Sequence, residues 1–154
     1  MSRSKPERRH PQPTLALDVP SQTTYLAMIR ELTRHMAALA GFDEAVAGRL
    51  ALAVDEAATN TIEHAYGGAP DRLVQLRFDD GADELRVEII DTGATVDPRK
   101  VPSVDLDRYV KQRRTGGLGV HLMEKIMDSV TFRRAQGRNI CCLVKRKDGS
   151  AGTP

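Results

Sequence analysis

A carboxylate and a carboxamide, Glu56 and Asn60, stand four residues apart in a stretch with helical apolar spacing. Residues four apart on a helix project from the same side, so the two groups are expected to lie together. The Asn60 carbonyl oxygen suits Mg²⁺, which completes its shell with water and phosphate oxygens. The Glu56 carboxylate can accept a proton from an attacking hydroxyl as a phosphoryl group transfers. Alone, the pattern also fits an ordinary solvated helix face.

A glycine-rich turn further along the chain leads into a second segment with helical spacing. Its residues are Arg114, Thr115, Gly116, Gly117, Leu118, Gly119 and Val120. Backbone N–H groups at a helix start bind phosphate, and glycine lacks the side chain that would block the approach. Arg113 and Arg114 can reach phosphate oxygens. The alternative is a flexible hinge. The turn matches neither a Walker A loop nor a dinucleotide fingerprint, because no Gly-Lys-Ser/Thr and no βαβ unit accompany it.

Asp91 and Gly93 follow a strand-like run, residues 87–90, that is expected to be buried. An ionised carboxylate in such a place is costly unless a donor satisfies it. The amino group of adenine would supply that donor, whereas guanine presents an acceptor at the same position. Glycine at position 93 fits a backbone that approaches a base closely or takes a positive φ. The alternative is a plain strand-ending turn.

The elements that must position these groups follow from the spacing of apolar residues and from turn signals. We expect an edge strand over 14–19, a helix capped by Ser21 and ended by Gly41, a second helix from Asp43 to about Tyr66, strands over 73–78 and 85–90, a helix from Leu118 to about Met127, and strands over 130–135 and 139–145. This order predicts an α+β fold: a two-layer sandwich of a mostly antiparallel mixed sheet packed on helices.

The domain organisation is simple. Residues 1–13 are predicted to be a disordered leader, residues 14–147 one folded domain, and residues 148–154 a disordered tail. Residues 92–115 lack periodicity, and a loop of that length in a compact domain is usually a functional lid.

Charge and composition exclude several classes of function. A formal net charge of +2, from 23 basic and 21 acidic residues, gives no global field that would favour nucleic acid. The chain has neither an apolar signal region nor a run of about 18 apolar residues, so secretion and membrane spanning are disfavoured. Cys141 and Cys142 are neighbours on a predicted strand and point to opposite faces, which indicates buried thiols in a reducing cytoplasm.

Taken together, these motifs resemble the ATPase family shared by gyrase, Hsp90, histidine kinases and MutL. Within it, the sequence looks most like the anti-sigma-factor serine kinases of the partner-switching type. Residues 51–66 resemble the N box of that group, residues 91–93 its first glycine box, and residues 115–121 with 127–130 its second. The resemblance spans about residues 14–147.

The resemblance implies a Bergerat-type ATP-binding fold with ATP and Mg²⁺ as cofactors. It implies Mg²⁺ on Asn60, a catalytic base in Glu56, adenine recognition by Asp91, and a lid over about residues 94–115. It further implies a cytoplasmic homodimer whose partners are a STAS-type anti-sigma-factor antagonist and a sigma factor. Direct binding to nucleic acid or membrane is not implied.

One departure from the wider family concerns position 95, where Thr95 replaces a second glycine. This change weakens the gyrase-like interpretation more than the kinase interpretation. A competing function is an ATP-binding regulator that holds its partners without phosphotransfer, but retention of Glu56 favours the kinase. A catalytic fragment of a two-component kinase is disfavoured because no phosphoacceptor histidine helix precedes the domain.

Overall fold

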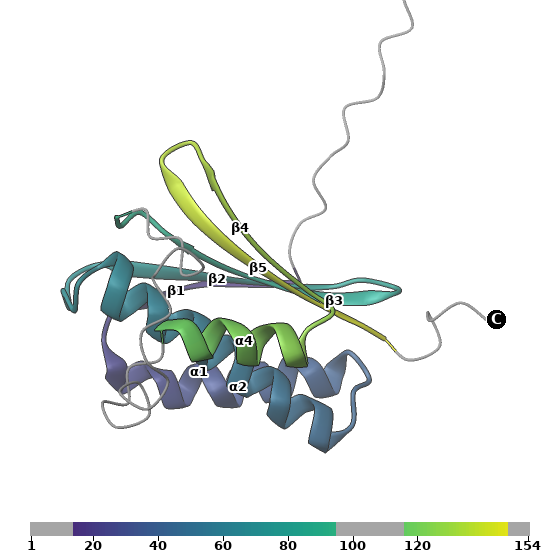
Figure 1. Ribbon diagram of the computed structural model, residues 1–154. Coiled ribbons are helices and arrows are strands. Elements are labelled where there is room, and N and C mark those ends of the chain that lie inside the picture. Colours follow the sequence, from purple (N-terminus) through teal and green to yellow (C-terminus); the bar gives the residue numbers. More distant parts are fainter. Residues whose placement is uncertain (1–13, 95–115, 148–154) are drawn as a thin grey trace, which may run out of the picture.

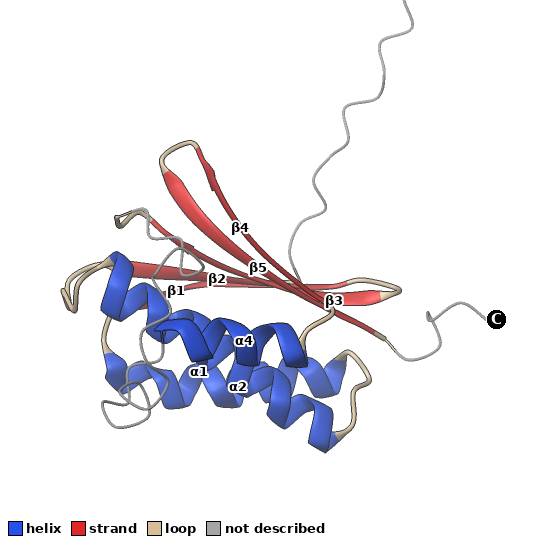
Figure 2. Ribbon diagram, in the orientation of Figure 1, coloured by secondary structure: helices blue, strands red, loops and turns tan. Residues whose placement is uncertain are grey.

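A sheet and a layer of helices on one of its faces make up the protein, as the computed structural model shows (Figures 1 and 2). The structure describes residues 14–94 and 116–147. Its elements are β1 (Leu15–Pro20), η1 (Thr23–Tyr25), α1 (Leu26–Leu39), α2 (Glu44–Asn60), η2 (Thr61–Ala65), β2 (Leu73–Asp80), β3 (Glu84–Asp91), α4 (Gly116–Ile126), β4 (Ser129–Ala135) and β5 (Arg138–Arg146). The predicted leader and tail, and the predicted lid from residue 95 to Thr115, lie outside the described residues.

The sheet has five strands in the described residues, in the order β1-β2-β3-β5-β4. All of these pairings are antiparallel, so the two-layer α+β class is confirmed, while the partly parallel sheet that the sequence allowed is not found. Strand β5 lies between β3 and β4, although β4 precedes it in the chain. This insertion places Asn139 of β5 opposite both Asp91 of β3 and Arg134 of β4.

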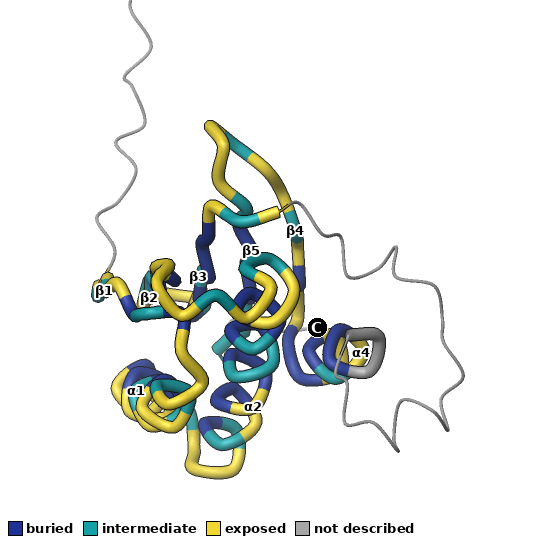
Figure 3. The backbone as a smooth tube through the Cα atoms, turned by 90° about the vertical axis from the view of Figure 1, so that its left-hand side faces the viewer, coloured by how far each residue is buried: buried dark blue, intermediate teal, exposed yellow. Residues whose placement is uncertain are grey.

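The core lies between the sheet and the helices, where Figure 3 colours many residues of α2, α4 and the central strands as buried. Alternate β2 residues Val74, Leu76 and Phe78 point into it, as the period of a strand dictates. Helix α2 lies between α1 and α4 (Figure 3). No helix in the described ranges is long and apolar enough to cross a membrane.

Of the two residues predicted to cap helices, Asp43 does so and Ser21 does not. Asp43 caps α2, because its carboxylate accepts a hydrogen bond from the Val46 N–H at 2.8 Å. The prediction for Ser21 is wrong. Its Oγ donates to the Ala69 carbonyl at 2.5 Å and accepts from the Arg72 N–H at 3.1 Å. Ser21 therefore ties the end of β1 to the loop before β2, and a short 3₁₀ turn, η1, precedes α1.

The adjacent cysteines have the predicted arrangement. Neither cysteine is part of a disulfide in the described residues, and both are buried. Cys141 belongs to the core cluster on the helix-facing side, and Cys142, its neighbour on β5, takes the other face. Burial raises the pKa of the Cys142 thiol above its ordinary value, which lowers its reactivity near neutral pH.

The Ser21 contact generates a stability prediction. Ser21→Ala would leave the Arg72 N–H and the Ala69 carbonyl without their partner in a place where Ser21 is only 1% exposed. Each unsatisfied buried group costs about 1–3 kcal/mol, so we expect a clear fall in the urea midpoint. The matched control is Thr23→Ala, an exposed neighbour. Equal midpoints for the two variants would show that the contact does not stabilise the fold.

Candidate functional site

Polar atoms of two side chains at the end of α2 are buried without hydrogen-bond partners. In the described part of the chain, Glu56 Oε2 and both polar atoms of the Asn60 side chain have none. Such groups are costly, and each one in a native protein calls for an explanation. A carboxylate oxygen without a partner can accept a proton, and a neighbouring amide oxygen without a partner can bind a hard cation.

A π-helical turn, η2, continues α2 directly after Asn60. The Tyr66 N–H donates to the carbonyl of Thr61, five residues back, at 3.0 Å. Single π turns of this kind are frequent at functional sites. Here the turn brings the Thr61 hydroxyl to Asp91, where it donates to Oδ2 at 3.4 Å. The two predicted motifs, Glu56–Asn60 and Asp91–Gly93, are therefore neighbours.

The Asp91 carboxylate receives its donors from the protein itself. It is 6% exposed, and its Oδ1 accepts from the Gly93 N–H at 2.9 Å and from Asn139 Nδ2 at 2.8 Å. A ligand was expected to satisfy this charge, but three protein groups already do so, including the Thr61 hydroxyl. A carboxylate offers about four lone-pair sites, so capacity for a further donor remains.

Gly93 is required by a close approach to another part of the backbone. A Cβ at this position would overlap the carbonyl group of Ala65 in η2. Next to it, the Ala94 N–H donates to that same carbonyl at 2.9 Å. Gly93 does not have a positive φ. Of the two reasons predicted for this glycine, close approach is therefore the one observed, and the partner is the protein backbone.

Helix α4 brings the glycine-rich segment to the same place. A Cβ at Gly119 would lie 2.7 Å from Glu56 Oε2 and 3.8 Å from Asn60 Nδ2. The α4 helix begins at Gly116, two residues before the predicted start at Leu118, and so includes Gly117 as well. The Val120 side chain is buried in the core, so only its backbone can face a ligand. Arg114 and Thr115 lie outside the described residues.

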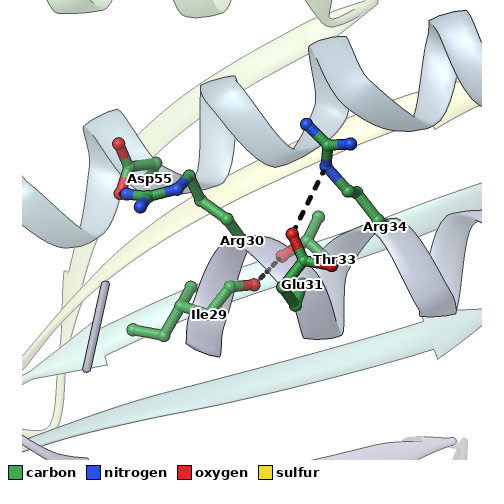
Figure 4. Close-up of polar contacts among 6 residues, drawn as sticks. All are labelled: Ile29, Arg30, Glu31, Thr33, Arg34 and Asp55. Atoms are coloured by element: carbon green, nitrogen blue, oxygen red, sulfur yellow. Dashed lines mark hydrogen bonds and ion pairs between the residues drawn. The ribbon is translucent and has the colours of Figure 1, made fainter. Parts of the chain in front are cut away.

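Burial and two like charges shape the electrostatics of Glu56. Desolvation raises the pKa of its carboxyl above the ordinary value, and repulsion from Asp55 and Glu63 raises it further. Asp55 itself pairs with Arg30 of α1, with 3.1 Å between Nη1 and Oδ1 (Figure 4). A carboxyl whose pKa moves toward neutrality is a better general base at physiological pH.

Sequence reasoning missed two residues of this site. Thr61 follows the predicted metal ligand directly, but its contact with Asp91 joins residues 30 positions apart and depends on how α2 packs against β3. Asn139 was placed on a strand with no role, because its contact with Asp91 depends on the pairing of β3 with β5. The signal that could have drawn attention to it was a neutral polar residue directly before the apolar run of the last strand.

A cation at this site would depend on few protein ligands. Within residues 14–94 and 116–147, no group of three or more His, Cys, Asp or Glu side chains is arranged to hold a metal ion. A single amide oxygen such as that of Asn60 fits Mg²⁺ that takes most of its other ligands from phosphate and water.

Comparison with known proteins identifies the class. A family profile described as the histidine kinase-like ATPase domain matches residues 19–145, and the chain belongs to this family of ATP-binding domains. The serine-protein kinase RsbW of Bacillus subtilis is 34% identical over 128 residues, 80% of this chain and 79% of that protein. RsbW of Listeria monocytogenes is 28% identical over 130 residues, 82% of this chain and 83% of that protein. Within the family, the chain therefore groups with the RsbW serine-protein kinases.

Solved structures support the same fold. The chain resembles the RsbU and RsbW domains of a Mycobacterium tuberculosis protein with a TM-score of 0.57 at 19% identity, covering 87% of this chain and 33% of that one. It resembles a histidine kinase domain from Erythrobacter litoralis with a TM-score of 0.51 at 21% identity, covering 82% of this chain and 61% of that one. At these identities the likeness concerns the fold alone.

The contact between Gly93 and Ala65 generates a second prediction. In Gly93→Ala, the new methyl group must displace the backbone of η2, so we expect destabilisation by about 2 kcal/mol or more. Gly48→Ala is the matched control, because Gly48 lies within α2 and a Cβ there meets nothing within 4 Å. That control should raise the free energy of unfolding by up to about 1 kcal/mol. Similar effects of the two changes would contradict the proposed clash.

A third prediction follows from the raised pKa of Glu56. At a pH below its ordinary pKa of 4.5, the carboxyl is protonated in the folded and unfolded states and costs nothing. As pH rises through the raised pKa of the folded state, ionisation in the partly buried site destabilises the wild type. Glu56→Gln should therefore unfold a few degrees higher than wild type at pH 7.5 and at the same temperature at pH 4. A difference that does not change with pH would refute this assignment.

Proposed function

We propose that the protein is an ATP-dependent protein-serine kinase and anti-sigma factor, which phosphorylates a STAS-type antagonist and otherwise sequesters a sigma factor. The observation that carries the proposal is the pair of unpartnered groups, Glu56 Oε2 and Asn60 Oδ1, buried together under Gly119. The names of the relatives, serine-protein kinase RsbW, support the same conclusion. We also propose that residues 14–147 act as one domain in a cytoplasmic homodimer.

In the proposed reaction, the serine oxygen of the antagonist forms a bond to the γ-phosphorus of ATP. The bond from that phosphorus to the β,γ-bridging oxygen breaks, and ADP leaves with the electron pair. Glu56 accepts the serine proton, which its raised pKa favours. Asn60 would hold Mg²⁺, which when bound neutralises charge on the phosphate oxygens.

Nucleotide binding is divided between two ends of the site in this proposal. Asp91, supported by Gly93, would accept a hydrogen bond from the amino group of adenine. The segment from Arg114 to Val120 would hold the phosphates through its backbone N–H groups and the Arg114 guanidinium. This division separates residues that bind ATP from Glu56, which acts on the acceptor hydroxyl.

The separation can be tested with Glu56→Ala. The purified variant and wild type are incubated with labelled ATP, Mg²⁺ and a STAS-type protein encoded beside this one. We expect the variant to bind ATP within several-fold of wild type and to lose phosphotransfer by at least a hundredfold, the lower range for a general base. Arg49→Ala, on the exposed side of α2, serves as the control.

Three outcomes distinguish the functions. Transfer of label by wild type and not by the variant supports the kinase. ATP binding without transfer by wild type would instead support a regulator that holds partners without phosphorylating them. Equal loss of binding and turnover in Glu56→Ala would give this residue a structural role.

A further inference from the structure

Three polar side chains form a hydrogen-bonded row across adjacent strands at one end of the sheet. Arg134 of β4 stands opposite Asn139 of β5, and Asn139 stands opposite Asp91 of β3. Arg134 Nη1 donates to Asn139 Oδ1 at 3.1 Å, and Asn139 Nδ2 donates to Asp91 Oδ1 at 2.8 Å. The row therefore runs from an exposed guanidinium to a buried carboxylate.

The order of donors in this row determines which way the Asn139 amide faces. A guanidinium group can only donate hydrogen bonds, so Arg134 requires the amide oxygen. The amide nitrogen must then face Asp91. The same nitrogen lies 3.1 Å from the Gly93 carbonyl and 3.3 Å from the Ala94 carbonyl, two further acceptors. Every neighbour of the amide thus favours one orientation.

This orientation leaves one oxygen of Asp91 available to a ligand. Oδ1 already accepts from Asn139 and from the Gly93 N–H. Oδ2 is approached only by the Thr61 hydroxyl in the described structure, at the long distance of 3.4 Å. With Oδ1 held by two donors, the carboxylate cannot rotate freely, and Oδ2 is presented as an acceptor.

We propose that Asn139, oriented by Arg134, is a positioning residue that makes Asp91 selective for a purine with a 6-amino group. This inference rests on the proposed function, in which Asp91 recognises adenine. A fixed acceptor oxygen gains a hydrogen bond from the adenine amino group and repels the carbonyl of guanine. If the Asp91 carboxylate could rotate, it would lose both the hydrogen bond to adenine and the repulsion of guanine. Asn139 therefore affects discrimination between bases and not phosphate binding.

The experiment compares three nucleotides with Mg²⁺ by calorimetry: ATP, GTP, and purine riboside triphosphate, which lacks the 6-amino group. Asn139→Leu keeps a similar volume and removes the donor. We expect this variant to bind ATP about tenfold more weakly than wild type, because hydrogen bonds to charged groups are stronger than those between neutral groups. Affinity for purine riboside triphosphate should stay within twofold of wild type, and preference for ATP over GTP should fall.

A second variant covers the case in which Asn139→Leu folds poorly. Arg134→Met retains the apolar stem and removes the guanidinium that orients the amide, so we expect a loss of ATP affinity of about threefold, with the same fall in preference for ATP over GTP. Its matched control is Arg133→Met. Arg133 precedes Arg134 in β4 and lies on the other face of the sheet, where its Nη2 is 3.8 Å from Glu88 Oε1. The Arg133→Met variant should bind all three nucleotides as wild type does.

The possible failures are distinguishable. Equal weakening of all three nucleotides would give Asn139 a merely structural role and overturn the inference. Unchanged ATP affinity in both Asn139→Leu and Arg134→Met would also overturn it, while leaving the kinase proposal intact. A wild-type protein that binds none of the three nucleotides would overturn the proposed function and this inference together.

Discussion

The burial of α2 on both sides is the constraint on which the rest of the site depends. This helix packs between α1 and α4 and under the sheet, and small residues let its neighbours approach closely; its buried apolar residues are Ala47, Leu50, Ala51, Ala53, Val54, Ala57 and Ala58. The same packing continues to its polar end, where Asn60 is buried and Glu56 is partly so. Desolvation of these two groups is thus a consequence of how the core is built, and it raises the proton affinity of Glu56.

Two glycines allow separate parts of the chain to reach this end of α2. Gly119 lets α4 lie against the Glu56 carboxylate, and Gly93 lets the turn after β3 lie against the Ala65 carbonyl. Both have ordinary φ values, so absence of a side chain is the property that matters at these positions, and not backbone flexibility. The glycine-rich segment was interpreted as a phosphate loop or a hinge. In the described residues, its Gly119 is also required for close packing of α4 against α2.

The sequence predicted local features well, since their causes are local. The Asp43 cap, the two hairpins and the proximity of Glu56 to Asn60 depend on residues a few positions apart. Features that depend on distant pairing were not predicted. Ser21 was assigned as a helix cap from its local position, because its true partners lie 48 and 51 residues away in the sequence. Asn139 was overlooked for the same reason, because its contact requires β5 to be inserted between β3 and β4.

The two ends of the site differ in how fully their hydrogen bonds are satisfied, and this difference has a mechanistic consequence. At one end, Asp91 is held by three protein donors before any ligand arrives. At the other, Glu56 and Asn60 keep open atoms. If Asp91 binds adenine as proposed, this preorganised acceptor loses little entropy on binding, and more of the binding energy is available to position the rest of the nucleotide. In the proposed reaction, the unsatisfied end would gain its partners only when phosphate, cation and acceptor hydroxyl are all in place, and such an arrangement favours a transition state over a bound substrate.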